Sequence, residues 1–375
     1  MKRGSPVWSA AWLLPAILLP VIAVLISCGG GGGGGGGGTF SQADLAGTWD
    51  IIEFDTGSGF GWARLNVTLD ASGNLLLNNG ADSSGFTYSG PPFDTLAKWT
   101  IDGSGTVRMS DTSSGSVSPS FYGSLSSNKN LGAATDNAGM PYTYTLLVSR
   151  KTGFDNITYG NADIRGRTFV YHQLYAGPDN VWVYGYGSID ALGRVTLDNA
   201  VDPSGALPGY PLVNFTTYAV DTAGIVTNPP GNDFYGWITH DKSTLFGLID
   251  DPVTHTGHRF IVFQFLGATY TQADLAGRWR WHVLYGWSSP GWVKGAWTID
   301  AAGAATYDPT DFLTEHGWTT PPTEPETHTI SPSGIITNSL ATPYHGMLSA
   351  GKDLVVRTKS HGTGPTRYSI GISVK

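Results

Sequence analysis

Cysteine is nearly absent from this chain of 375 residues, which contains only Cys28. A single thiol cannot form an intrachain disulfide, and it cannot supply the several thiolates that many structural zinc sites use. All nine histidines follow residue 171, so the first third of the chain has none. His255 and His258 share one predicted loop, but a closed zinc site needs about four ligands. We therefore expect no metal and no cofactor.

Basic charge is also scarce. Lys and Arg number 21 against 29 Asp and Glu, which gives a net charge of −8 at pH 7. Surfaces that bind nucleic acid need an excess of Lys and Arg to neutralise phosphates, so we expect no nucleic-acid partner. A Ser-His-Asp order, a nucleotide-binding glycine loop and a paired-carboxylate spacing are missing too. We therefore expect that the protein is not an enzyme.

Glycine and tryptophan, in contrast, are abundant at 52 and 13 residues, which is typical of a turn-rich all-β protein. The pattern Thr-aromatic-x-x-Ala-Asp-(Leu/Ile)-x-Gly occurs three times and begins at Thr39, Thr158 and Thr269. Such a long period indicates copies of one folding unit. The predicted units are residues 39–152, 153–267 and 268–375.

Each unit is predicted to contain eight short strands. In residues 63–69 apolar and polar side chains alternate without interruption, which indicates a strand with one buried face. Tight turns separate strands two and three, four and five, and six and seven, so they fall at one end of a meander and the long loops at the other. The turn after strand two is Asp-x-x-Gly, typical of type I geometry, at Asp70, Asp190 and Asp300. We predict three tandem eight-stranded antiparallel up-and-down barrels.

Two other architectures would also use 24 strands. A six-bladed β-propeller repeats every four strands, whereas the Thr-aromatic pattern recurs every eight. A single outer-membrane barrel needs strands of about 9 to 11 residues with an apolar outer band, and the predicted strands are shorter. The propeller is the alternative that we keep.

The N-terminus carries the strongest motif. Lys2 and Arg3 precede an apolar run that ends in Leu25-Ile26-Ser27-Cys28, and these are the marks of a secretory signal. The segment resembles a bacterial lipoprotein signal, whose lipobox cysteine is acylated before the leader is removed. The resemblance implies a signal peptide over residues 1–27 and lipidation of Cys28. An uncleaved transmembrane anchor is the alternative.

Ten glycines follow Cys28. Glycine has no side chain to pack, so residues 28–38 are expected to form a lipidated, flexible tether with a typical reach of about 16 to 19 Å. The residue after Cys28 is glycine, not the Asp that retains enterobacterial lipoproteins in the inner membrane. The resemblance therefore implies an outer-membrane protein that meets the membrane through its lipid anchor.

Residues 45–49 and 275–279 both read Leu-Ala-Gly-x-Trp, which resembles the Gly-x-Trp opening of lipocalin-like barrels. The resemblance is confined to these short stretches. It implies that Trp49 and Trp279 pack at the base of their barrels, and the second copy departs from it with Thr168 at the Trp position.

Aromatic side chains gather in the long loops of the third unit, and they suit stacking on a sugar ring or covering an apolar ligand. The candidate binding residues are Trp287, Trp292, Phe312, His316 and Trp318. These side chains could instead pack the loops onto their own barrel. Our leading hypothesis is a non-catalytic cell-envelope lipoprotein that binds a small apolar or saccharide ligand. A structural or adhesion protein that presents loops is the first alternative, and an enzyme acting on envelope glycan is the second.

Overall fold

The computed structural model describes residues 39–89, 94–111, 116–118, 120–137, 142–153, 156–177, 181–206, 217–229, 233–250, 257–286, 290–315, 325–340, 344–360 and 368–375. The lipobox and the glycine tether, including Cys28, lie outside this part of the chain. The residues that are described include no helix with the length and apolar character needed to cross a bilayer.

The first repeat forms a closed eight-stranded antiparallel barrel with one added short strand. Its strands are β1 (Gly47–Gly57), β2 (Gly61–Leu69), β3 (Asn74–Asp82), β4 (Thr87–Ser89), β5 (Asp94–Ile101), β6 (Thr106–Asp111), β7 (Tyr122–Leu125), β8 (Leu131–Asn137) and β9 (Thr143–Lys151). The pairing runs from β2 through β1, β9, β8, β7, β6 and β5 to β3, and β3 pairs again with β2 to close the ring. The added strand β4 lies beside β3.

The third repeat is a closed barrel of eight strands. They are β19 (Gly277–Gly286), β20 (Gly291–Ile299), β21 (Ala304–Thr314), β22 (Glu326–Ile330), β23 (Ile335–Asn338), β24 (Tyr344–Leu348), β25 (Leu354–Ser360) and β26 (Tyr368–Val374). Each strand pairs with its neighbour in sequence, and β19 pairs with β26. This is the up-and-down order predicted from the positions of the turns.

The second repeat forms a single antiparallel sheet. Its strands are β10 (Arg167–Ala176), β11 (Trp182–Ile189), β12 (Val195–Asp202), β13 (Gly205–Ala206), β14 (Ala219–Val220), β15 (Ile225–Thr227), β16 (Phe234–Ile238), β17 (Thr244–Asp250) and β18 (His258–Phe265). The sheet begins at β13 and ends at β14, and residues 207–216 between them lie outside the described part. Closure of this barrel therefore stays a prediction. The propeller alternative is wrong, because each sheet is one meander of a whole repeat instead of two four-stranded blades.

The hairpin turns follow from their sequences. The Asp70 carboxylate accepts hydrogen bonds from the backbone N–H groups of Ser72 and Asn74, at 2.8 and 2.9 Å. Gly73 has a φ of +85°, and a Cβ there would lie 1.9 Å from the carbonyl oxygen of Trp99. Only glycine fits such a position. The pattern Asp-x-x-Gly thus fixes both the turn and its approach to the neighbouring strand.

A short helical turn opens each repeat: α1 (Gln42–Leu45), η1 (Asn161–Asp163) and η2 (Gln272–Leu275). The indole N–H of Trp49 donates to the Leu45 carbonyl at 2.7 Å, and that of Trp279 donates to the Leu275 carbonyl at 2.8 Å. Both rings are buried, as the lipocalin-like resemblance implies. In the second repeat the residue in register with Trp49 is Phe169 and not Thr168, because Arg167 pairs with Ile189 as Gly47 pairs with Leu69.

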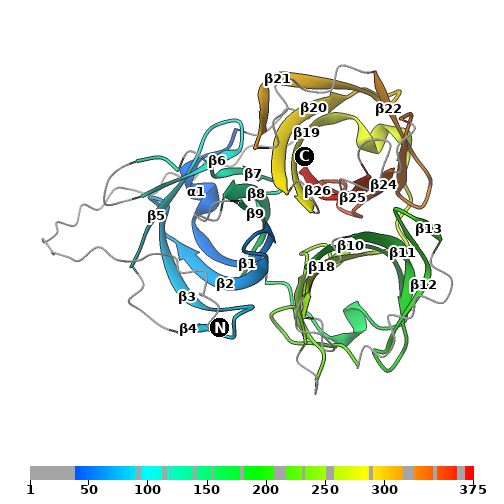
Figure 1. Cartoon of the computed structure of the whole chain (residues 1–375), viewed down its shortest axis with the longest axis horizontal. Helices are drawn as coiled ribbons and strands as arrows, with labels where there is room; N and C mark the ends of the chain where they lie inside the picture. Colours follow the sequence, from blue (N-terminus) through cyan, green and yellow to red (C-terminus); the bar gives the residue numbers. More distant parts are fainter. Residues whose placement is uncertain are drawn as a thin grey trace, which may run out of the picture.

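The three units pack side by side around a shared apolar core, and Figure 1 shows their three curved sheets next to one another. The first two strands of each unit contact the seventh or eighth strand of the next: β1 contacts β17, β10 contacts β25, and β19 contacts β8. The order first to second, second to third and third to first is head-to-tail and closes on itself. Ile52, Val262 and Ile372 are fully buried in this shared core.

One hydrogen bond recurs at all three junctions, so the contacts are related by an approximate threefold axis. A tryptophan near the start of the second strand donates its indole N–H to the last residue of the seventh strand of the next unit. The pairs are Trp62 with Asp250 at 2.5 Å, Trp182 with Ser360 at 2.9 Å and Trp292 with Asn137 at 2.6 Å.

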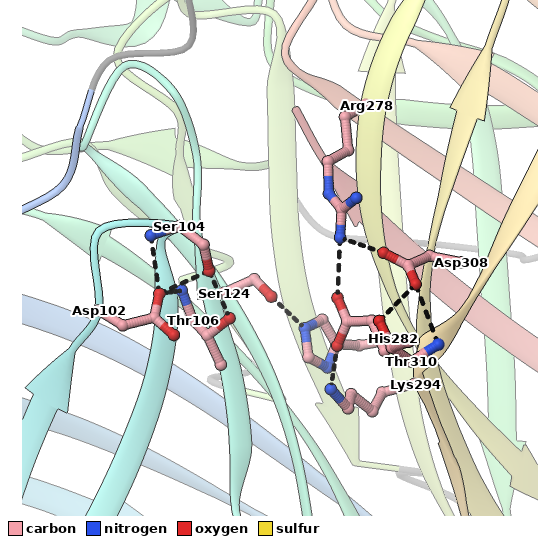
Figure 2. A network of polar contacts seen from close by, with 10 residues as sticks. Asp102, Ser104, Thr106, Ser124, Arg278, His282, Lys294, Asp308 and Thr310 are labelled. Carbon is pink, nitrogen blue, oxygen red and sulfur yellow. Dashed lines mark hydrogen bonds and ion pairs between the residues drawn. The ribbon is translucent and has the colours of Figure 1, made fainter.

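Polar contacts flank the junction between the third and first barrels (Figure 2). His282 Nε2 on β19 lies 3.0 Å from the Ser124 hydroxyl on β7. His282 Nδ1 lies 3.4 Å from the Thr135 hydroxyl. On the third barrel, Arg278 forms an ion pair with Asp308 at 2.8 Å. The imidazole is therefore held from the first barrel on both of its nitrogen atoms.

Candidate functional site

The hairpin ends of the three units lie on one face of the molecule. The turns between their sixth and seventh strands meet at the approximate threefold axis. There Asn128 Nδ2 donates to Asp353 Oδ2, and the Gly351 N–H donates to Asp241 Oδ2, both at 2.8 Å. With Arg150 these turns line a polar cavity of about 30 Å³, which has room for about one or two waters. The strand ends that lead into the long connections of the three units therefore share the opposite face.

The described chain begins on the hairpin face. The Phe40 N–H donates to the Gly103 carbonyl at 3.3 Å, and Gln42 Nε2 donates to the Trp99 carbonyl at 2.9 Å. The Phe40 ring covers Gly105, where an added Cβ would lie 2.6 Å from it. Gly103 and Gly105 belong to the hairpin turn between β5 and β6. Thr39 is therefore on the face opposite to the long loops.

Side chains fill the deep interiors. Within the second sheet, Phe169 stacks on Phe263 with ring centroids 4.3 Å apart, and Tyr218 stacks on Phe234 at 4.4 Å. In the described parts of the first and third barrels, the best-defined interior cavities have volumes of about 20 and 10 Å³. A pocket for a drug-sized ligand needs about 300 to 1,000 Å³. These two cavities are therefore much too small for such a ligand.

The interior of the third barrel holds a buried arginine. The guanidinium carbon of Arg357 lies 4.6 Å from the ring centroid of Trp297 and 5.4 Å from that of Trp281, within cation–π range. Phe312 on β21 packs against Trp281, with ring centroids 6.2 Å apart. This predicted binding residue is half-buried and belongs to the packing around the buried Arg357.

Trp292, another predicted binding residue, lies in a different place. It is 1% exposed, and its ring packs on Tyr122 of the first barrel with centroids 5.4 Å apart. Side chains alternate along β20, so Trp292 points to the neighbouring unit instead of its own interior. Phe312 and Trp292 therefore do not share a site. For the candidates outside the described residues, the binding role stays a prediction: Trp287, His316 and Trp318.

The mouth of the first barrel contains carboxylates that sequence reasoning missed. Trp49 faces the barrel core, so Glu53 and Asp55, at even spacing along β1, face the interior too. The strand register places Asp55, Thr145 and Asp136 in one row across β1, β9 and β8. The Thr145 hydroxyl donates to Asp55 Oδ1 at 2.5 Å. Two carboxylates thus lie in one row near the open end.

Glu53 lies one row deeper. It is opposite Ala63, which in turn is opposite Asp82 on β3. The Tyr88 hydroxyl donates to Asp82 Oδ2 at 2.9 Å. Glu53 is 7% exposed, and it forms no hydrogen bond or ion pair with the residues that the structure describes. An interior carboxylate without a partner is costly, so it marks a site of interest.

The environment of these acids disfavours their charged forms. Burial raises the pKa of Glu53 well above its usual value, and the Asp55 and Asp136 charges add to that shift. Burial also raises the pKa of Asp55 to about 7, although the hydrogen bond from Thr145 opposes it. Burial raises the pKa of Asp136 as well. No Lys or Arg contributes to any of these three shifts.

Apolar side chains surround this acidic mouth. Exposed residues from three of the long connections are Phe86 at 55%, Val117 at 59% and Tyr142 at 72%. The sequence of the four long connections contains no Lys, Arg or His; they span residues 55–62, 82–94, 111–121 and 137–143. The mouth therefore combines carboxyl groups inside with apolar surface at its rim.

A signal for this site exists in residues 49–55, which read Trp-Asp-Ile-Ile-Glu-Phe-Asp. If Trp49 faces the barrel interior, as the lipocalin-like resemblance implies, then period-two alternation directs Glu53 and Asp55 inward. The residues predicted to bind a ligand were instead the aromatic residues of the third unit.

No family model matches this chain, and no curated protein matches it. Among solved structures it is similar to the isotype 1 transferrin binding protein B of serogroup B Neisseria meningitidis, with 9% identity over 88% of this chain and 75% of that one and a TM-score of 0.28. It is similar to a protein of unknown function from Nostoc punctiforme, with 11% identity over 89% and 97% of the two chains and a TM-score of 0.22. It is also similar to a protein from Lactobacillus plantarum, with 14% identity over 84% of this chain and 92% of that one and a TM-score of 0.15. TM-scores of this size carry no information about function.

Proposed function

We propose that this chain is a lipid-anchored, non-catalytic protein of the bacterial cell envelope, whose barrel mouths bind small ligands on the side facing away from the membrane. The position of Thr39 carries the proposal. It lies on the hairpin face, so a tether that joins it to an acylated Cys28 leaves the loop face free. With a tether reach of about 16 to 19 Å, the hairpin face stays closer to the lipid surface.

The acidic mouth supports a binding role. Glu53 is buried without a partner, which lowers stability, and proteins retain such arrangements mainly where a function depends on them. The sequence offers no nucleophile and base in a catalytic order. A binding mouth therefore accounts for the unpaired carboxylate without any chemical step.

The packing of the three units favours a second function, in which the protein presents its loops to a larger partner. The closed ring holds the three units side by side, with the strand ends that lead into the long connections on one face. A rigid array of this kind can make several contacts at once, which increases the overall affinity. This is the structural or adhesion alternative of the sequence analysis.

Lipidation is tested by metabolic labelling. Cells that express the full chain are grown with an alkyne analogue of palmitate, and the wild type is expected to be labelled and to sediment with membranes. The Cys28→Ala variant is expected to lose both properties. A wild-type protein without label, or a labelled Cys28→Ala variant, would rule out the proposed anchor.

Orientation is tested with fluorophores on the anchored protein. Ser72 lies in a hairpin turn and Ser84 in a long loop of the same barrel, and each is replaced by cysteine and labelled in vesicles. Lipids with a nitroxide headgroup are expected to quench the label at residue 72 more strongly than the label at residue 84. Equal quenching would contradict the proposed orientation.

A further inference from the structure

We infer that the mouth of the first barrel binds an organic cation, a ligand that carries an ammonium or guanidinium group on an apolar body. The charged group would lie among Glu53, Asp55 and Asp136, and the apolar body would contact Phe86 and Tyr142 at the rim. The inference deepens the proposed function and rests on it, because the ligand can reach the mouth only if the mouth faces away from the membrane.

Each of the three carboxylates has an oxygen that accepts no hydrogen bond within the described part of the chain. Asp55 is oriented by the Thr145 hydroxyl at 2.5 Å, and Asp136 accepts a hydrogen bond of 2.7 Å from the Ser120 hydroxyl. Glu53 is only 7% exposed. It has no hydrogen-bond or ion-pair partner in the described part of the chain. An ammonium or guanidinium group supplies several N–H donors, so it can satisfy Glu53 and approach its two neighbours together.

The charge around the site selects a cation over an anion or a sugar. The long connections of this barrel contain no basic residue, so they offer an anion no opposite charge. A cation stabilises the ionised form of these acids, which burial otherwise disfavours, whereas a neutral sugar does not. The strength of the attraction increases because the acids lie away from bulk water.

The surroundings also favour an organic cation over a metal ion. Calcium sites need six to eight oxygen ligands that converge on one point. The residues that the structure describes contain no group of three His, Cys, Asp or Glu side chains placed to hold a metal. An apolar rim offers no ligand atoms to a metal ion, whereas it buries apolar surface of a carbon-rich ligand.

The site belongs to the first unit alone. By strand register, the residues that correspond to Glu53 are Gln173 in the second unit and Val283 in the third. The residues that correspond to Asp136 are Ile249 and Lys359. Glu53 and Asp136 therefore have no acidic counterparts in the other two units, and we expect one ligand to bind per chain.

The test uses the full acylated protein in detergent and a pair of matched probes. Phenethylamine is charged at pH 7.5, and 2-phenylethanol has the same ring and chain length without the charge. Isothermal titration is expected to show saturable 1:1 binding of phenethylamine and binding of 2-phenylethanol that is at least about tenfold weaker, the ratio expected for one charge-assisted hydrogen bond. Equal binding of the two probes, or no binding of either, would overturn the inference.

Two variants locate the binding. Glu53→Gln removes the unpartnered charge and keeps the shape, and we expect it to weaken phenethylamine binding by about tenfold to a hundredfold. Asp300→Asn makes the same change in net charge in a hairpin turn of the third barrel and is expected to leave the affinity unchanged. If Glu53→Gln binds phenethylamine as tightly as the wild type, the assigned ligand class is refuted. It is also refuted if Glu53→Gln loses binding of calcium chloride but keeps binding of phenethylamine. Labelling at Cys28 is measured separately, so failure of the anchor and failure of the cation site are distinguishable.

Discussion

The indole N–H of Trp292 donates a 2.6 Å hydrogen bond to the side-chain oxygen of Asn137, across the junction between the third and first barrels. Trp292 was predicted from the sequence to bind a ligand, but its indole N–H is used in this contact. Because Trp62 and Trp182 make the same contact at the other two junctions, this tryptophan position serves the assembly of the ring. Its replacement should affect stability first.

Substitution of Trp292 tests that role. Trp292→Phe should lower the free energy of unfolding by about 1 kcal/mol, because it removes one hydrogen bond. Trp292→Ala should lower it by about 3 to 5 kcal/mol, because it also leaves a cavity. Urea unfolding measures both values. Tyr142→Phe at an exposed position is the control and should change stability by less than about 0.5 kcal/mol, and an unchanged urea midpoint for Trp292→Ala would contradict the prediction.

The junction between the first and second units contains a buried ion pair. Arg150 and Asp50 are joined at 2.9 Å, with side chains 2% and 8% exposed. Arg150 also donates to the carbonyl oxygens of Ala223 and Ile238, both at 2.7 Å. Arg150→Met leaves Asp50 buried without its partner and should cost about 3 to 5 kcal/mol in urea unfolding.

The double variant Arg150→Met with Asp50→Leu should cost less than the sum of the two single changes, since no lone charge is left behind. Gln264 occupies the position of Arg150 in the second unit and donates to the Met347 carbonyl at 3.1 Å. Gln264→Met is the matched neutral control and should cost about 1 kcal/mol. Additive effects of the two single changes at Arg150 and Asp50 would argue against a coupled pair.

Histidines make two of the three junctions sensitive to acid. Burial lowers the pKa of both His172 and His282 to about 3, and it lowers the pKa of His345 to about 4. Each is neutral when folded, while the unfolded chain takes up protons near pH 6.5, so their contribution to stability is lost as the pH falls below 6.5. Ile52 occupies the corresponding place in the first unit, so the first-to-second junction has no buried imidazole at this position.

His282→Gln should weaken that pH dependence. Glutamine can still hydrogen bond with Ser124 and Thr135 but does not titrate. Urea midpoints measured between pH 7 and pH 4.5 should fall less steeply for the variant than for the wild type. Parallel curves would show that His282 does not bind protons differently in the two states.

The acidic mouth should give the opposite pH dependence. Burial raises the pKa of Glu53 well above the usual value and that of Asp55 to about 7. The folded protein therefore holds these protons longer than the unfolded chain, and their contribution to stability is lost as the pH rises from about 4 through 7. Glu53→Gln should raise the melting temperature at pH 8 and leave it nearly unchanged at pH 4.

Asp70→Asn is the control with the reverse sign. Burial raises the pKa of Asp70, but the hydrogen bonds from Asn74, Ser72 and Gly73 together outweigh it and lower the pKa overall. Its contribution to stability is present above pH 4 and is lost at lower pH, so this variant should lower the melting temperature at pH 7 and have less effect at pH 3. Calorimetry at the four pH values measures both variants, and a stabilised Asp70→Asn at pH 7 would contradict the assignment.

Local features of the fold could be predicted because local physics determines them. Asp70 and Gly73 fix a hairpin through a side-chain cap and a positive φ, and neither depends on distant residues. Repetition of such turns predicts the meander order and places the hairpins of each unit at one end.

Packing between the units was not predicted, although the sequence contained a signal. Ile52 and Phe54 face outward from the first barrel into the shared core, while Ile51 faces inward. A strand that is apolar on both faces is buried on both faces. The weak alternation of strand one therefore indicated a second contact surface, and the identity of the partner could only come from three-dimensional complementarity.

The head-to-tail closure also limits how the chain could grow. The first two strands of each unit contact one neighbouring unit, and its last strands contact the other. A fourth copy would therefore find no free contact surface. Three identical subunits could form the same closed ring, but the mouths of all three would then be identical. Joining the copies in one polypeptide lets each cup diverge, which is how acids line one of them and a stacked arginine fills another.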